Sequence, residues 1–107
     1  MALTFNQYAQ QASTTAIYST ATAIEYTTLG LTSEAGEVAG VLKRHLRGDQ
    51  KELDKDKMLL EIGDVLWYCA ELSKSLGSDL ETVAHMNMSK LAKRKVDGTI
   101  KGSGDYR

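Results

Sequence analysis

Residues 29–43, LGLTSEAGEVAGVLK, decide the fold because they combine helical spacing with two carboxylates. Leu31, Val38 and Leu42 follow one another at intervals of seven and four residues, which puts their side chains on one face of an α-helix. Extended in both directions, the pattern predicts a long helix over residues 24–46. Its apolar face is expected to turn toward a core.

The rest of the chain also has helical spacing and contains no proline to interrupt it. Residues that can cap a new helix are Thr4, Asp54 and Asp79. A threonine-rich segment predicts a break near residues 19–23, and the last two helices are expected to end near residues 76 and 96. The third helix has an expected inward stripe that includes Leu59, Ile62, Leu66 and Leu76. We therefore expect an all-α, antiparallel four-helix bundle-like domain over residues 1–98 and a flexible tail over residues 99–107.

The 107 residues suffice for one modest core. The net charge is −1, but the charges are unevenly distributed along the chain. Residues 25–86 hold 12 acids and 7 bases, whereas residues 87–107 hold six bases and two acids. An acidic middle and a basic end suit a metal site beside a phosphate site, although solvated helix faces produce the same division. The bases are few and hardly interleaved with aromatic residues, so nucleic-acid binding is not expected.

No apolar run approaches the ~18 residues that a membrane helix requires, and the start of the chain lacks the features of a signal peptide. We therefore expect a soluble, cytoplasmic protein without a membrane partner. The single cysteine, Cys69, lies near Leu66 and Leu72, where a thiol usually packs as a small apolar side chain.

Two carboxylate pairs occur in the middle of the chain, Glu34 with Glu37 and Glu61 with Asp64. The members of each pair are three residues apart and project from one helix face. If residues 48–54 turn the chain back, the two pairs face each other. Facing carboxylates repel unless a cation neutralises them, and an all-oxygen set suits Mg²⁺ or Mn²⁺. The alternative is a charged, solvated helix face without a metal. The Glu-x-x-His pairs of di-iron bundles are missing, which favours hydrolysis over redox chemistry.

Three motifs also resemble a known family. They are residues 29–43, residues 59–68 (LLEIGDVLWY) and residues 87–94 (NMSKLAKR). In this order and spacing they closely resemble the MazG-like all-α nucleotide pyrophosphohydrolases over about residues 4–98. The resemblance implies that the four carboxylates bind Mg²⁺ and that a nucleoside triphosphate is cleaved to the monophosphate and pyrophosphate. One departure is RKVDG at residues 94–98, where relatives usually read Arg-Tyr-Pro-Asp-Gly.

The resemblance assigns phosphate or nucleotide binding to Asn87, Lys90 and Arg94. Lys90 and Arg94 are four residues apart and so share a helix face. A basic helix end is also explained by the helix dipole alone, which is the alternative. Tyr68 is expected to stack on the bound base, whereas Trp67 is expected to pack in the core.

These observations predict a Mg²⁺-dependent nucleoside triphosphate pyrophosphohydrolase in which one of four carboxylates is the general base. The candidates are Glu34, Glu37, Glu61 and Asp64. The sequence indicates neither the base nor the sugar of the nucleotide. The alternative function is a catalytically silent helical module for nucleotide sensing or assembly.

Self-association into a homodimer or homotetramer is expected for two reasons besides the resemblance. Residues 1–24 carry no charge, and glycines inside the predicted helices indicate close approach by another helix or a ligand. These glycines are Gly36, Gly40 and Gly63. The stripe of Phe5, Tyr8 and Ala12 is expected to pack on a partner, the alternative being that it folds back on its own chain.

Overall fold

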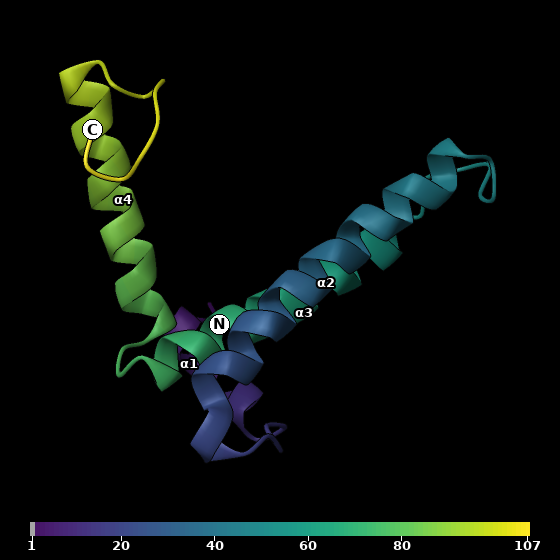
Figure 1. Ribbon diagram of the computed structural model, residues 1–107, viewed down its shortest axis with the longest axis horizontal. Coiled ribbons are helices and arrows are strands. Elements are labelled where there is room, and N and C mark those ends of the chain that lie inside the picture. The colour runs from purple at the N-terminus through teal and green to yellow at the C-terminus, as the bar shows by residue number, and fades with distance from the viewer. Residues whose placement is uncertain (1) are drawn as a thin grey trace.

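A computed structural model describes residues 2–107, which form an all-helical arrangement (Figure 1). The elements are α1 (Phe5–Ser13), the short 3-10 helix η1 (Thr20–Thr22), α2 (Ala23–Leu46), α3 (Lys55–Ser75) and α4 (Leu80–Asp97). No strand occurs among the described residues, so the predicted all-α class is confirmed. Within the same residues, no helix is both long and apolar enough to cross a membrane.

Three helices begin at the predicted capping residues. At the start of α1, the Thr4 hydroxyl accepts a hydrogen bond from the Gln7 N–H at 3.0 Å, and the Gln7 side chain accepts one from the Thr4 N–H at 2.8 Å. This reciprocal capping box satisfies two N–H groups that the first turn leaves free. Asp54 and Asp79 cap α3 and α4 by accepting from the N–H three residues on.

The predicted break after the first helix is present but wider than residues 19–23, because α1 ends at Ser13 and α2 begins at Ala23. The hydroxyls of Thr14 and Thr15 donate to carbonyl oxygens of the last turn of α1, at 2.6 and 2.8 Å. Such side-chain bonds compete with the helical backbone pattern, which explains why α1 stops early.

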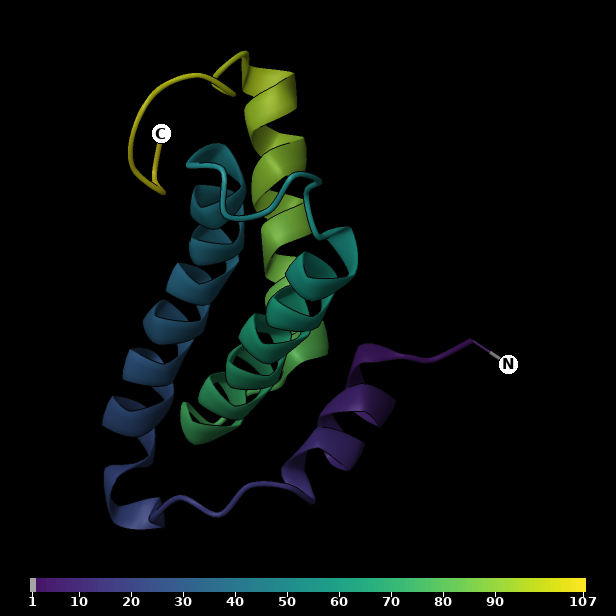
Figure 2. The same ribbon diagram turned by 90° about the vertical axis from the view of Figure 1, so that its right-hand side faces the viewer.

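The core of the fold is an antiparallel pair formed by α2 and α3, with α1 packed on α3 and α4 (Figures 1 and 2). Gly48 has a φ of 93° and allows the chain to turn after α2. Ala12 is buried, and its carbonyl accepts a hydrogen bond from Trp67 Nε1 at 3.1 Å. The prediction that the stripe of α1 packs on a partner is therefore wrong for Ala12, which packs on its own chain. Phe5 remains 44% exposed.

The single chain is open because α4 diverges from the α2–α3 pair (Figure 1). Its radius of gyration is 16.6 Å. A compact domain of this length is expected to have a value of about 13 Å. The four helices therefore do not close into a tight bundle within one chain.

Parts of the predicted apolar stripes are exposed for the same reason. Leu42 on α2 is 40% exposed, and Leu59, Ile62 and Leu76 on α3 are 65%, 49% and 63% exposed. The prediction that these side chains face a core of their own chain is wrong, because the divergence of α4 leaves their helix faces open. On α3 the buried positions include Ala70 instead.

The glycines inside the helices differ in their surroundings. A Cβ added at Gly36 or Gly63 would meet no atom within 4 Å among the described residues, and one at Gly40 would meet a side chain of the same helix. The predicted approach of another helix to these glycines is therefore absent in this chain, and approach by a ligand stays a prediction. Gly30 is the tightly packed position, because a Cβ there would overlap the ring of Tyr68.

Candidate active site

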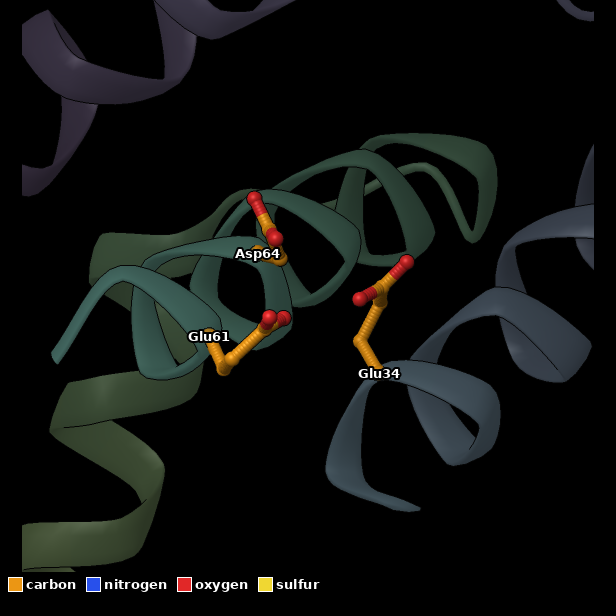
Figure 3. A group of neighbouring side chains, drawn as sticks. All are labelled: Glu34, Glu61 and Asp64. Atoms are coloured by element: carbon orange, nitrogen blue, oxygen red, sulfur yellow. The ribbon is translucent and has the colours of Figure 1, made fainter. Parts of the chain in front are cut away.

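Three of the four predicted carboxylates come together between α2 and α3. Glu34 on α2 and Glu61 and Asp64 on α3 each offer an oxygen, and these oxygens lie within 4.8 Å of one another. Figure 3 shows the Glu34 and Glu61 side chains pointing toward each other across the space between the two helices. The antiparallel pairing of α2 and α3 thus brings the two carboxylate motifs to the same height.

Glu37, the fourth predicted carboxylate, is exposed and lies outside this group of three. It follows Glu34 by nearly one turn of α2, so its carboxylate is displaced along the helix axis. Its negative charge still contributes to raising the pKa of Glu34. Its role as a metal ligand stays a prediction.

The cluster is electrostatically unfavourable without a cation. Burial, followed by the charges of Asp64 and Glu61, raises the pKa of Glu34 above its usual range. Partial desolvation, followed by the charge of Glu61, likewise raises the pKa of the largely exposed Asp64. The Lys57 ammonium group lies 3.1 Å from a Glu61 oxygen and partly offsets this repulsion by lowering the pKa of Asp64.

This donor set fits a hard divalent cation. Its three ligand groups are carboxylates, the oxygen ligands that Mg²⁺ and Mn²⁺ prefer. The mutual repulsion that raises two of their pKa values would be relieved by a bound positive charge. Glu34, Glu61 and Asp64 are therefore the residues that could hold the ion.

A cavity of about 340 Å³ opens beside two of these carboxylates. Its lining residues are Thr15, Ile17, Tyr18, Tyr26, Glu34, Asp64, Trp67 and Tyr68. Half of them are aromatic, which makes this a pocket with flat apolar walls and an acidic end. Predicted residues from α2 and α3 thus share one cavity with residues of the segment before α2.

The aromatic wall is a packed cluster. The Tyr18 and Tyr26 rings stack with centroids 5.1 Å apart, and the Trp67 and Tyr68 rings meet edge to face at 4.9 Å. The close approach of Gly30 lets the Tyr68 ring lie against α2. Interaction with the Tyr26 hydroxyl, followed by burial, raises the pKa of Tyr68 to about 12.

Trp67 has two roles in the structure. Its Nε1 donates to the Ala12 carbonyl and, at 2.9 Å, to the Thr15 hydroxyl, which fixes the segment after α1 on α3. Its ring also lines the cavity. The predicted packing role is therefore accompanied by direct exposure to the pocket.

Sequence reasoning missed four wall residues, which are Thr15, Ile17 and Tyr18 before α2 and Tyr26 in the first turn of α2. Residues 14–22 have no helical periodicity, so nothing in the pattern indicates which side chains turn toward α3. The available signal was the pair of tyrosines in residues 14–26, which otherwise consist mainly of small residues.

The predicted phosphate-binding residues of α4 lie apart from the carboxylates in this chain, because α4 carries them away from the α2–α3 pair (Figure 1). Asn87 and Lys90 line a separate hollow of about 490 Å³ together with Asp105 and Tyr106. The structure therefore does not join the two halves of the predicted site within one chain.

The C-terminal segment folds back along α4 and reaches these cations (Figure 1). Lys90 Nζ lies 3.0 Å from the carboxylate of Asp105, and Arg94 donates to the Gly104 carbonyl at 3.0 Å. Arg94 is only 7% exposed, and its Nε atom has no hydrogen-bond partner among residues 2–107. Gly98, with a φ of 70°, ends α4 and starts this return. The flexibility of residues 99–107 stays a prediction.

Comparison with known proteins identifies the family. The family model described as the MazG nucleotide pyrophosphohydrolase domain matches residues 22–98. The chain belongs to this family. The MazG match includes both carboxylate motifs and the cations of α4, whereas α1 and the C-terminal segment lie outside it.

One relative supports the same relationship over nearly the whole chain. The chain is 42% identical over 109 residues to the Gene 37 protein of Mycobacterium phage L5, covering 94% of this chain and 96% of the relative. No solved structure matches the chain.

Proposed function

We propose that this MazG-family protein is a Mg²⁺-dependent pyrophosphohydrolase that cleaves a ribo- or deoxyribonucleoside triphosphate to the monophosphate and pyrophosphate. The supporting observation is the position of the carboxylate cluster at the acidic end of an aromatic cavity. A triphosphate needs a cation, and a nucleobase needs flat apolar walls, so one nucleotide can use both parts of the site.

The metal would be held by Glu34, Glu61 and Asp64, with Glu37 as a further ligand. When bound, Mg²⁺ supplies positive charge to the triphosphate and lowers the pKa of water. A carboxylate of the cluster takes the proton of the attacking water as general base.

Two groups of residues would orient the nucleotide. Tyr68 stacks on the base from α3, where its ring already lines the cavity. Asn87, Lys90 and Arg94 bind phosphate oxygens, and Lys90 and Arg94 provide the positive charge. The Asp105 carboxylate forms ion pairs with Lys90 and Arg94 in the structure, so a phosphate group must displace it.

Self-association as a homodimer or homotetramer is part of this proposal. Leu59, Leu60 and Met86 are all at least 65% exposed, and α4 diverges from the helices that carry the carboxylates. A second copy would cover such apolar side chains and bring further helices to the site. Light scattering at micromolar concentration tests this, because a monomer with full activity would contradict it.

Activity is tested by measuring pyrophosphate release from a panel of ribo- and deoxyribonucleoside triphosphates, with Mg²⁺ and with a chelator. The proposal requires metal-dependent turnover of at least one nucleotide. If no nucleotide of the panel is hydrolysed but nucleotide binding is intact, the result would instead support a sensing or assembly module.

A further inference from the structure

Another acidic residue of α3 is buried apart from the carboxylate cluster. Glu71 is only 1% exposed and lies seven residues, about two helical turns, beyond Asp64. The Ser13 hydroxyl donates to one of its carboxylate oxygens at 2.7 Å, and the Tyr18 hydroxyl donates to the other at 2.6 Å. Both oxygens of this carboxylate are thus bound, one by the last residue of α1 and the other by the segment that follows it.

Such an arrangement needs an explanation, because burying a carboxylate is costly unless its oxygens are hydrogen-bonded. Hydrogen bonds to a charged group are also stronger than those between neutral groups. Trp67, one turn before Glu71 on the same helix, holds the end of α1 through Ala12 and the segment after it through Thr15. Two side chains of α3 therefore fix this segment at two adjacent points.

The segment that they fix forms one wall of the cavity. Thr15, Ile17 and Tyr18 line the cavity together with the carboxylates Glu34 and Asp64. The ring of Tyr18 stacks on a second tyrosine and meets the Trp67 ring edge to face at 6.3 Å. The bond from the Tyr18 hydroxyl to Glu71 therefore sets the position of an aromatic ring in the pocket.

We infer that Glu71 is a positioning residue for substrate recognition. Its carboxylate holds the Tyr18 ring in the wall against which the base of the nucleotide packs. This inference rests on the proposed function and deepens it, since it assigns recognition of the nucleobase to the wall formed by Thr15, Ile17 and Tyr18. The site then selects phosphate anhydrides that carry an aromatic base over inorganic polyphosphate, which meets only the cation and the basic groups.

The test compares two conservative variants with a matched control. Tyr18→Phe removes the hydroxyl and keeps the ring, and Glu71→Gln keeps the shape and removes the charge. Thr14→Ala is the control, because Thr14 is exposed and bonds only to the turn of its own helix end. KM and kcat are measured for the best nucleoside triphosphate, and inorganic tripolyphosphate is measured as a competitive inhibitor.

We expect Tyr18→Phe and Glu71→Gln each to raise KM about tenfold, equivalent to about 1.4 kcal/mol, which is within the range of a hydrogen bond to a charged group. The kcat value should stay within about twofold, and the inhibition constant of tripolyphosphate should not change. The double variant should be no worse than Glu71→Gln alone, because the Tyr18 hydrogen bond that Tyr18→Phe removes is one of the two that Glu71 accepts. Thr14→Ala should match the wild type.

A second readout does not depend on turnover. Trp67 is the single tryptophan and lies in the cavity wall, so its fluorescence reports nucleotide binding directly. If the wild type binds nucleotide without hydrolysing it, the proposed hydrolysis fails, but the same tenfold change in Kd still tests Glu71. The inference would be overturned if both variants kept the wild-type KM or Kd for nucleotide, or if they bound tripolyphosphate more weakly to the same extent. It would also be overturned if the wild type bound no nucleotide.

Discussion

Replacing one carboxylate of the metal cluster should have opposite effects on stability with and without Mg²⁺. Asp64→Asn keeps the size of the side chain and removes one negative charge from the group in which the ligand oxygens of Glu34, Glu61 and Asp64 lie within 4.8 Å of one another. In the metal-free protein this relieves repulsion. In the presence of Mg²⁺ it removes a ligand charge.

The size of the first effect follows from the geometry. Two like charges at this separation repel by about 1 kcal/mol in water and by about 3.5 kcal/mol at an effective dielectric constant of about 20. Asp64 is exposed, so the lower value applies. A gain of about 1 kcal/mol corresponds to a rise in Tm of about 4 °C for a domain of this length.

The second effect has the opposite sign, because a ligand at about one hundred times its Kd stabilises the folded state by about 2.7 kcal/mol. Wild type should gain Tm on addition of saturating Mg²⁺, and Asp64→Asn should gain much less. Thermal unfolding followed by circular dichroism, in chelator and in Mg²⁺, measures both effects. Glu52→Gln is the control, since Glu52 is exposed in the turn between α2 and α3. The reasoning is refuted if Asp64→Asn is less stable than wild type in chelator, or if its Mg²⁺-induced rise equals that of wild type.

Further predictions concern Glu37, the α4 cations and Tyr68. Glu37→Gln should raise the Mg²⁺ concentration needed for half-maximal turnover, and unchanged kinetics at limiting Mg²⁺ would remove Glu37 from the ligand set. Asp105→Asn should lower KM for the nucleotide severalfold because it frees Lys90 and Arg94 for phosphate, an effect measured in the steady state and contradicted by an unchanged or higher KM. The Tyr68 hydroxyl, with a pKa raised from 10.0 to about 12, should stabilise the fold below pH 10 and lose that contribution as pH rises toward 12. Ultraviolet absorbance titration of wild type and Tyr68→Phe measures the pKa. The variant should lose a tyrosine that titrates well above pH 10, and loss of a tyrosine with a normal pKa instead would contradict the prediction.

The helices could be predicted from the sequence because their limits depend on neighbouring residues. Thr4, Asp54 and Asp79 each accept a hydrogen bond from an N–H three residues on, so the sequence alone locates the helix starts. The direction of α4 depends on packing between distant segments, which helical spacing does not specify. The prediction that Leu59 and Leu76 face inward is wrong for that reason.

The carboxylate cluster was partly predictable for a related reason. The three-residue spacing of Glu61 and Asp64 fixes their common face, and the turn after α2 brings Glu34 beside them. The aromatic wall was not predictable, because Tyr18 lies in a segment without periodicity and its orientation depends on Glu71, more than 50 residues away along the chain. A buried glutamate has no local signature, since the same residue on a helix usually faces solvent.

The identity of the products tests the proposed reaction most directly. Phosphorus NMR of the protein incubated with each nucleoside triphosphate distinguishes the monophosphate and pyrophosphate from the diphosphate and inorganic phosphate. We predict the monophosphate and pyrophosphate in equal amounts with Mg²⁺, no reaction with a chelator, and strongly reduced reaction with Asp64→Asn. Formation of the diphosphate and inorganic phosphate, or no turnover of any nucleotide with Mg²⁺ present, would contradict the proposal.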